Sequence, residues 1–444
     1  MHLHPPGTRN RTQTVRRLRA ISTCGIAIGL AAGSLHSPAL AESAPAPLTT
    51  NVGLGAQAGS NWIASRLTST GSAPLAGDTR EAASALFTSA TNEAAARKAL
   101  SFLRSNLDPA ATHGALAQLI LVAVVAGENP RAFGGTGAIN DLVARLATTK
   151  TTSGPDRGLY GPPNEFGSVY NQGLVLQALG ALGETDADAI AWLKAQQCAD
   201  GSFEEYRANL TTPCDPLDPA GFTGPDTNGT ASAVLGLAAV GTTAPLSPLA
   251  WLDSHQSATG GWAYLPGATE ADDPNSTALV IQALRALGVT DADARFTKGT
   301  STPVSTLLRF QFGCAAAAAD RGGFWYPPYG DSGYLPDVKA TSQAVIALAG
   351  AAVPAKKTST WTEPTDACAP SASSSTTLST TTTSSTVPAA KPTTTSAATT
   401  TTLQATTTPT SDSSTAAPAA VAGASQTRPA VAAKPTTSTA RYAG

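Results

Sequence analysis

The chain is built around a repeated segment in which an acid-containing turn leads into an Ala- and Leu-rich helix that ends at a glycine. The two clearest copies begin at Asp226 and Asp273, and a degenerate copy begins at Asp337. An earlier copy, which runs through Tyr170, keeps the helix but lacks the leading aspartate. Periods of roughly 45 to 65 residues indicate stacked helical hairpins, because one hairpin cannot bury its apolar face alone.

Three copies continue into a second helix and a loop that contains glutamine, glycine and an aromatic residue. The aromatic residues of these loops are Phe203, Trp262 and Phe324. This pattern resembles the repeats of the prenyltransferase and squalene-oxidase superfamily. The resemblance implies an all-α fold, the α/α toroid, in which inner and outer helices alternate around a central cavity. Terpene cyclases, protein prenyltransferase β subunits, complement thioester domains and cobalamin carriers share that fold, so the resemblance leaves the function open.

Apolar periodicity and glycine stops predict further helices in the first part of the chain. They are an outer helix that ends near residues 62–67 and helices at 78–86, 93–103, 114–127 and 141–146. Together with the later pairs they give about twelve helices. This number predicts a toroid of six hairpins over roughly residues 54 to 365.

Both ends of the chain differ in composition from the repeats. Residues 1–41 combine five arginines, an apolar run over 21–35 and an Ala-Leu-Ala site, the pattern of an export signal. Residues 369–444 consist almost entirely of Thr, Ser, Ala and Pro, so we expect a disordered tail. The folded head is therefore assigned to residues 42–368, and the protein is expected to be secreted or associated with the cell wall.

The head is acidic. The whole chain has 28 basic and 30 acidic residues, and nine of the basic residues and one of the acids lie in the two ends. The head therefore keeps 19 basic and 29 acidic side chains, a formal charge of −10. This excess of carboxylates argues against nucleic acid or an anionic lipid surface as a partner.

The cysteines are consistent with export. Four of the five lie in the head: Cys198, Cys214, Cys314 and Cys368. Four cysteines permit three disulfide connectivities, of which we prefer Cys198 with Cys214 and Cys314 with Cys368. A zinc site is the competing interpretation, but the head has no Cys-x-x-Cys motif and two histidines, so we expect no metal and no cofactor.

Aromatic residues and aspartates gather in the loops that enter the inner helices of the implied toroid. The aspartates at the helix starts are expected to act mainly as N-terminal caps, with a ligand contact as the sharper alternative, which Glu165 and Glu204 or Glu205 would join. Aromatic residues that the repeat does not demand either form a wall that faces a ligand or pack the loops. The candidate ligand-binding residues are Asp226, Asp273, Asp337, Tyr170, Tyr264, Trp325, Tyr326, Tyr329 and Tyr334.

The sequence assigns no catalytic residue. In terpene cyclases that start by protonation, the matching turn reads Asp-x-Asp-Asp, whereas Asn228 and Asn275 stand here at the position of the central acid. An amide cannot protonate an alkene, so cyclisation is disfavoured. The zinc-binding triad of protein prenyltransferases and the Cys-Gly-Glu-Gln thioester motif are both missing from the sequence.

These observations favour non-catalytic binding at or beyond the cell surface. By resemblance, the ligand is an isoprenoid or another largely apolar molecule; a corrinoid is weakened because no β domain follows the repeats. Three alternatives remain open. They are a divergent terpene cyclase or prenyltransferase-like enzyme, a carbohydrate-active toroid with paired carboxylates and a surface glycan as ligand, and a structural cell-wall protein.

Overall fold

The computed structural model describes residues 45–49, 51–164, 167–207, 209–219, 221, 223–267, 272–326 and 333–369. Within them the chain forms twelve α-helices, two single-turn 3-10 helices (η1 and η2) and isolated bridges in place of β-strands. The α-helices are α1 (Val52–Arg66), α2 (Ala76–Ser89), α3 (Glu93–Ser105), α4 (His113–Ala126), α5 (Leu142–Ala147), α6 (Val169–Ala181), α7 (Ala187–Ala195), α8 (Thr227–Ala239), α9 (Leu249–Ser254), α10 (Pro274–Ala286), α11 (Pro303–Leu308) and α12 (Val338–Leu348).

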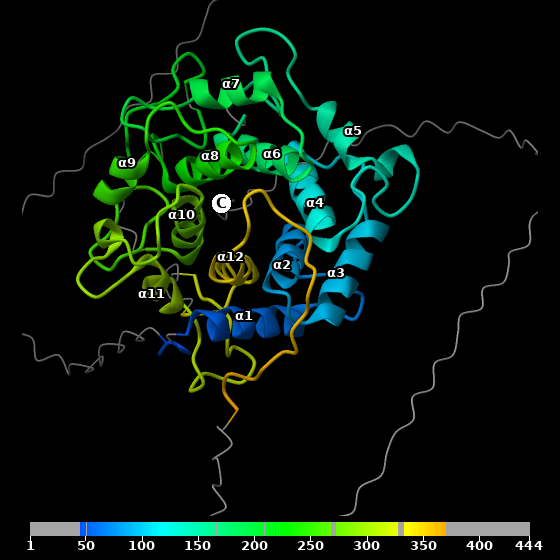
Figure 1. The fold of residues 1–444 in the computed structure, drawn as a ribbon, viewed down its shortest axis with the longest axis vertical. Coiled ribbons are helices and arrows are strands. Elements are labelled where there is room, and N and C mark those ends of the chain that lie inside the picture. The colour runs from blue at the N-terminus through cyan, green and yellow to red at the C-terminus, as the bar shows by residue number, and fades with distance from the viewer. Residues whose placement is uncertain are drawn as a thin grey trace, which may run out of the picture. The chain divides into compact units, whose positions relative to one another are not determined.

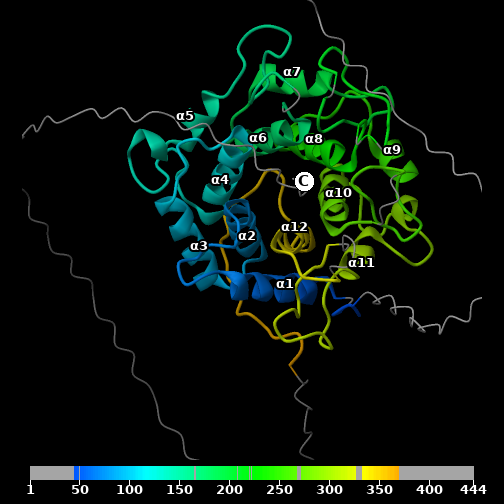
Figure 2. The ribbon, with the colours of Figure 1, turned by 180° about the vertical axis from the view of Figure 1, so that it is seen from behind.

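The helices form two concentric rings (Figures 1 and 2). The inner ring consists of α2, α4, α6, α8, α10 and α12, and each of these helices packs against the next. Contact between α12 and α2 closes the ring, while α1, α3, α5, α7, α9 and α11 lie outside it. The head is therefore an α/α toroid of six hairpins, which confirms the predicted fold class.

Side-chain caps start five of the six inner helices. The residues before them are Thr112, Ser168, Asp226, Asp273 and Asp337, and each accepts a hydrogen bond from a backbone N–H group of the first turn. These bonds satisfy donors that have no partner inside the helix. In the remaining inner helix, α2, the position is held by Leu75, which has no such side chain.

The repeated glutamine of the loops ties each hairpin to its neighbour. Gln256 donates from its amide nitrogen to the carbonyl oxygen of Gly260 in its own loop and to that of Phe296, each at 2.8 Å. Gln311 does the same with Gly322 at 2.9 Å and with Gly55 of α1 at 2.8 Å, so this bond helps to close the ring. The spacing of glutamine and glycine thus encodes a contact between hairpins, and the aromatic residues Phe203, Trp262 and Phe324 are fully buried beside it.

The inner helices approach one another closely because small residues occupy their contact faces. A Cβ atom added to Gly173 of α6 would overlap the backbone of Ser232 in α8, and one added to Gly236 would lie 2.6 Å from the carbonyl oxygen of Gly173. Both helices are therefore held at a separation that permits no side chain at these positions.

The chain after α12 forms a strap, residues 350–366, across one end of the inner ring. Figure 1 shows this segment in orange, passing from α12 towards α1. The amide of Thr358 donates to the carbonyl of Val125 and that of Thr362 to the carbonyl of Ala90, both at 2.9 Å. Trp361 packs edge-on against Phe87. The strap therefore lies on the ends of α2 and α4.

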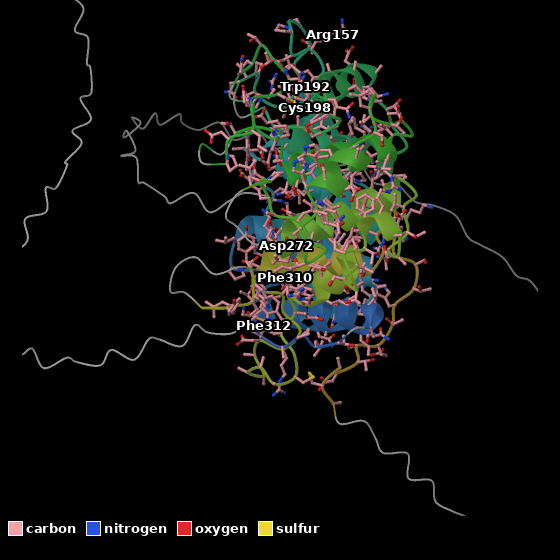
Figure 3. The ribbon with its side chains drawn as sticks, turned by 90° about the vertical axis from the view of Figure 1, so that its left-hand side faces the viewer. Arg157, Trp192, Cys198, Asp272, Phe310 and Phe312 are labelled. Atoms are coloured by element: carbon pink, nitrogen blue, oxygen red, sulfur yellow. A yellow bond between two sulfur atoms is a disulfide. The ribbon has the colours of Figure 1, made fainter. Side chains whose placement is uncertain are left out.

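Two disulfides are present, with the preferred pairing. Cys198 joins Cys214 in the loop after α7, the part of the ring where Figure 3 labels Trp192 and Cys198. Cys314 joins Cys368 and so fixes the chain just beyond the strap to the loop after α11. In the described part of the chain, no helix has the length and apolar character that a membrane span requires.

Candidate functional site

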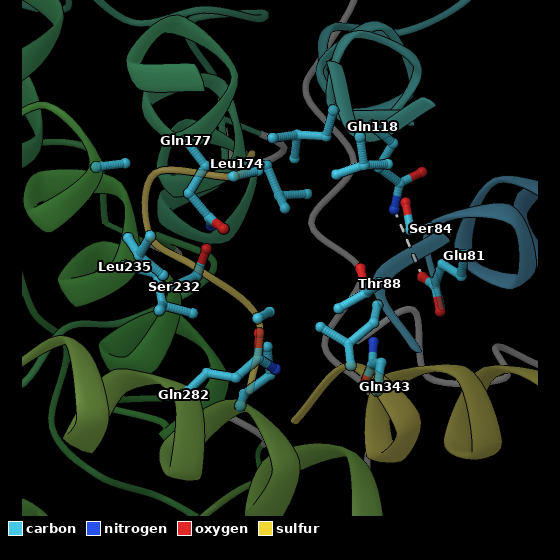
Figure 4. A pocket seen from close by; sticks show the side chains of 18 of the residues that line it. Glu81, Ser84, Thr88, Gln118, Leu174, Gln177, Ser232, Leu235, Gln282 and Gln343 are labelled. Atoms are coloured by element: carbon cyan, nitrogen blue, oxygen red, sulfur yellow. Dashed lines mark hydrogen bonds between the residues drawn. The ribbon is translucent and has the colours of Figure 1, made fainter. Parts of the chain in front are cut away.

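The inner ring surrounds a cavity of about 130 Å³ (Figure 4). All six inner helices contribute the same two positions to its wall, the sixth and the ninth residue of each helix. The sixth residues are Glu81, Gln118, Leu174, Ser232, Leu279 and Gln343, and the ninth are Ser84, Leu121, Gln177, Leu235, Gln282 and Ile346.

The wall of the cavity is neither apolar nor uniformly polar. Around the ring, the ninth residues alternate between a hydroxyl or amide side chain and an aliphatic one. The six residues at the sixth position comprise one carboxyl group, two amides, one hydroxyl and two leucines. A ligand in this space therefore meets both hydrogen-bonding groups and hydrocarbon, the combination typical of small-molecule sites.

One end of the cavity is closed by the strap. Residues 351–355 line the cavity there, together with Thr88 and Val125 near the ends of α2 and α4. The other end faces the loops that enter the inner helices, because the wall positions run from Tyr170 in the first turn of α6 down to these two residues.

A polar group on α2 and α4 forms one side of the wall. Arg80 donates from Nε to the amide oxygen of Gln118 at 2.8 Å, and the amide nitrogen of Gln118 lies 3.5 Å from Oε1 of Glu81. Burial raises the pKa of Glu81 to about 7, although Lys339 lowers it. Near neutral pH this carboxyl group is therefore poised between its acid and its carboxylate form.

A second buried carboxyl group, Glu205, lies at the capped end. It is 1% exposed, and burial together with the nearby Asp226 raises its pKa well above the usual value. The hydroxyls of Tyr206 and Tyr264 interact with it and oppose that shift. Burial also raises the pKa of Asp226, although the backbone amides of Gly229 and Glu205 donate to its carboxylate and lower it. The nearby Asp226 carboxyl group therefore disfavours the charged form of Glu205 in this buried site.

The three aspartates at the repeat starts are helix caps. Asp226 and Asp273 are buried, at 2% and 4% exposed, and Asp273 accepts hydrogen bonds from both the amide and the hydroxyl of Ser276. Asp337 is exposed and accepts from the amide of Ala340 at 2.8 Å. None of the three is among the residues that line the central cavity.

The aromatic candidates separate into two groups. Tyr170 lines the cavity, and Tyr264 interacts with Glu205 at the capped end. Trp325 instead packs against Tyr334, with ring centres 4.6 Å apart, and both belong to an apolar cluster of α1, α10, α11 and α12. Tyr326 is half-buried in the same loop. Tyr329 and Glu165 lie outside the described residues.

A second hollow lies beside the ring, between the starts of α4 and α6. It has a volume of about 570 Å³ and is open to solvent, and its seven lining residues are Thr112, His113, Thr149, Gly161, Pro162, Asn171 and Tyr206. Burial lowers the pKa of His113, so its imidazole is neutral at pH 7. In the described part of the chain, no three His, Cys, Asp or Glu side chains are grouped so as to hold a metal ion.

The sequence analysis did not identify the cavity wall. Glu81, Gln118, Gln177, Gln282 and Gln343 were not among the expected site residues, although a signal for them exists. The wall positions follow each helix-capping residue by six and nine places, so the register of the repeat relates Gln282 to Asp273 and Gln343 to Asp337. The sequence analysis named Glu204 or Glu205 as a residue that would join the aspartates in a ligand contact. The structure buries Glu205 at the capped end.

No family model and no curated protein matches this sequence. Among solved structures, the apo form of the type II terpene cyclase MstE from Scytonema superposes with a TM-score of 0.43 at 16% identity, covering 67% of this chain and 97% of that chain. The same enzyme with the product merosterolic acid A gives a TM-score of 0.39 at 15% identity, over 67% and 96%. Similarity at this level does not report on chemistry.

Proposed function

We propose that this protein is an exported, non-catalytic binding protein that holds a small, largely apolar, isoprenoid-like molecule in its central cavity. The observation that carries the proposal is the wall itself. Six helices place inward-facing side chains at one shared register, and the strap closes one end of the space that they surround. A ring that served structure alone would fill this space with aliphatic side chains, because buried voids are destabilising.

The volume limits the ligand. A cavity of about 130 Å³ is close to one that holds a benzene-sized molecule. It is well below the roughly 300 to 1,000 Å³ of typical drug-sized sites. The ligand is therefore a short isoprenoid or alkyl unit, or the end of a longer chain that enters from the capped side.

The proposed location rests on the disulfides and on the ends of the chain. Two disulfides in a head of this size are typical of proteins that work in an oxidising compartment. The arginine-rich start and the Thr/Ser/Pro-rich end add an export signal and a tail that associates with the cell wall. The partner of the head is then a molecule found outside the cell or in its envelope.

Native mass spectrometry of the full chain, secreted from its own type of host, tests binding directly. We expect one bound small molecule per head, which denaturing extraction then releases for identification. Leu235→Trp should displace it, because Leu235 is 1% exposed and lines the cavity. Leu246→Trp is the matched control, because Leu246 is 47% exposed in the loop before α9. An empty and folded wild-type head would reject the proposal and favour a structural wall protein or a glycan ligand.

An enzyme is the second candidate function, and one specific observation favours it. Glu81 in the cavity and Glu205 at its capped end are buried carboxyl groups whose pKa values are raised, the property that general acids need. If catalysis occurs, Glu205→Gln should retain an extractable molecule that differs from the wild-type one, as a substrate differs from its product. The same molecule in both proteins would leave binding as the function.

A further inference from the structure

We propose that the central cavity is a site for a primary amine with a short hydrocarbon body, held by hydrogen-bond acceptors on α2, α6, α10 and α12. The acceptors are the Glu81 carboxylate and the amide oxygens of Gln177, Gln282 and Gln343. This inference rests on the proposed binding function and specifies the chemical class of its ligand.

Two acceptors in the wall have no hydrogen-bond partner among the described residues. They are Oε2 of Glu81 and Oε1 of Gln343, and each of these atoms is buried. Gln343 as a whole is 5% exposed and lines the cavity. A buried acceptor without a donor is unfavourable, so a ligand that donates to both atoms supplies the missing hydrogen bonds.

Two other amide side chains of the wall each use one N–H group within their own helix. The amide nitrogen of Gln177 lies 3.5 Å from the carbonyl oxygen of Gly173, and that of Gln282 lies 3.2 Å from the carbonyl oxygen of Ala278, one turn earlier in the same helix. The amide oxygens are thereby left for a ligand. Figure 4 shows the side chains of Gln177, Gln282 and Gln343 directed towards the central space. The hydroxyl of Ser232 likewise donates to a backbone carbonyl, that of Tyr170, at 2.8 Å. The unpartnered acceptors of Glu81 and Gln343 therefore distinguish this wall, while each amide keeps a second N–H group that can also donate.

An ammonium group suits this wall better than a hydroxyl group. It supplies three N–H donors and no acceptor, whereas a hydroxyl supplies one donor. It also compensates the negative charge that Glu81 acquires when its proton leaves. The remaining charged groups near Glu81 balance one another, because Asp78 and Asp337 oppose Arg80 and Lys339. The ionised site then has a net charge of −1, which one ammonium ion neutralises.

Tyr170 does not change this balance. It lies close enough to Glu81 to interact with it, and the pKa of its phenol is raised well above the usual value, mainly by burial. The phenol therefore remains neutral over the whole pH range in which Glu81 titrates.

The hydrocarbon body of the ligand has its own contacts. Leu174, Leu235, Leu279 and Ile346 line the cavity between the amides. The volume matches a chain of about five carbons, by comparison with a cavity that holds benzene. Burial of each CH₂ group of such a chain is favourable, so the apolar body and the ammonium group both add to affinity.

The test compares n-pentylamine with 1-pentanol as probes of the full secreted chain, after denaturing extraction and refolding remove any resident ligand. Calorimetry at pH 8 should show that the amine binds at least tenfold more tightly than the alcohol. Glu81→Gln should abolish this preference while 1-pentanol still binds. Glu93→Gln, the same change at an exposed ion pair of α3, should leave the preference intact. The preference should also grow between pH 6 and pH 8, because Glu81 ionises in that range.

A second variant protects the test against a folding defect. Gln343→Leu removes one acceptor and adds hydrocarbon, so we expect weaker binding of the amine and equal or stronger binding of the alcohol. If both probes bind equally in the wild type, the amine inference is wrong and the proposed binding function stands. If neither probe nor benzene binds to the empty, folded protein, the binding function itself fails.

Discussion

The two ends of the inner ring are built in opposite ways. At the end where the inner helices begin, five helices have a capping side chain of their own, and the loops between them are tied by the repeated glutamine bonds. At the end where they finish, the strap that crosses the ring is one segment that the repeat does not contain. Several independent contacts therefore hold the capped end, whereas closure of the other end depends on a single segment of the chain.

This difference predicts how damage spreads. Loss of one cap frees a few backbone groups in one helix, and neighbouring hairpins keep their own. Loss of the strap uncovers the cavity and removes contacts to α2 and α4 at once. The capped end should thus tolerate substitutions one at a time, while the strapped end should respond as a unit.

The largest effect is expected from the disulfide that holds the strapped end. Replacing Cys314 and Cys368 with serine removes a crosslink between residues 54 apart, which the loop-entropy relation values at about 4 kcal/mol. Replacing Cys198 and Cys214, 16 residues apart, should cost about 3 kcal/mol. Guanidinium denaturation of each double variant measures both free energies of unfolding.

The two double variants should also differ in where the structure loosens. Amide hydrogen exchange should speed up at Thr358 and Thr362 in the first double variant, because their hydrogen bonds hold the strap. In the second it should speed up in the loop after α7. Unchanged exchange in the strap of the first variant would contradict its dependence on the Cys314 to Cys368 bond.

A smaller effect is expected from single caps, and burial should decide its size. Asp226→Ala removes an acceptor for the amides of both Gly229 and Glu205 in a buried site, so we expect a loss of about 2 to 3 kcal/mol. Asp337→Ala removes an exposed cap with one bond and should cost about 1 kcal/mol. Thermal and chemical denaturation measure both. Equal losses would show that burial does not separate these caps.

Most of the fold could be predicted from the sequence because the same short motifs recur in several copies of the repeat. The aspartate before three of the inner helices, the closing glycine and the glutamine loop are short-range signals, and they locate these helix starts and the hairpin contacts correctly. The preferred cysteine pairing is also confirmed: Cys198 and Cys214 lie in one loop, and Cys314 and Cys368 join the loop after α11 to the chain beyond α12. Confirmed expectations thus concentrate at the capped end, where physical demands are local.

The cavity wall and the strap were missed for different reasons. A glutamine at an inward position, such as Gln282, looks the same in the sequence as one that faces solvent, until the helix register relative to the ring axis is known. The strap has no helical period, and its bonds to Val125 and Ala90 join parts of the chain that are far apart in sequence. The raised pKa of Glu205 depends likewise on a tertiary neighbour, Asp226. Long-range contacts of this kind leave no local pattern.

The smallest effect expected is a pH dependence of stability at the capped end. Burial raises the pKa of Asp226 from 3.8 to about 7. Between these two values the folded protein keeps a proton that the unfolded chain has lost, so the free energy of unfolding falls as the pH rises and levels off above the folded pKa. Between pH 6 and pH 8 this contribution amounts to about 1 kcal/mol. Asp226→Asn keeps an acceptor for the helix cap but cannot ionise, so its profile should be flatter than that of the wild type. Urea denaturation at several pH values compares the two slopes, with Asp337→Asn as the exposed control, and parallel profiles for all three proteins would show that Asp226 does not titrate within the fold.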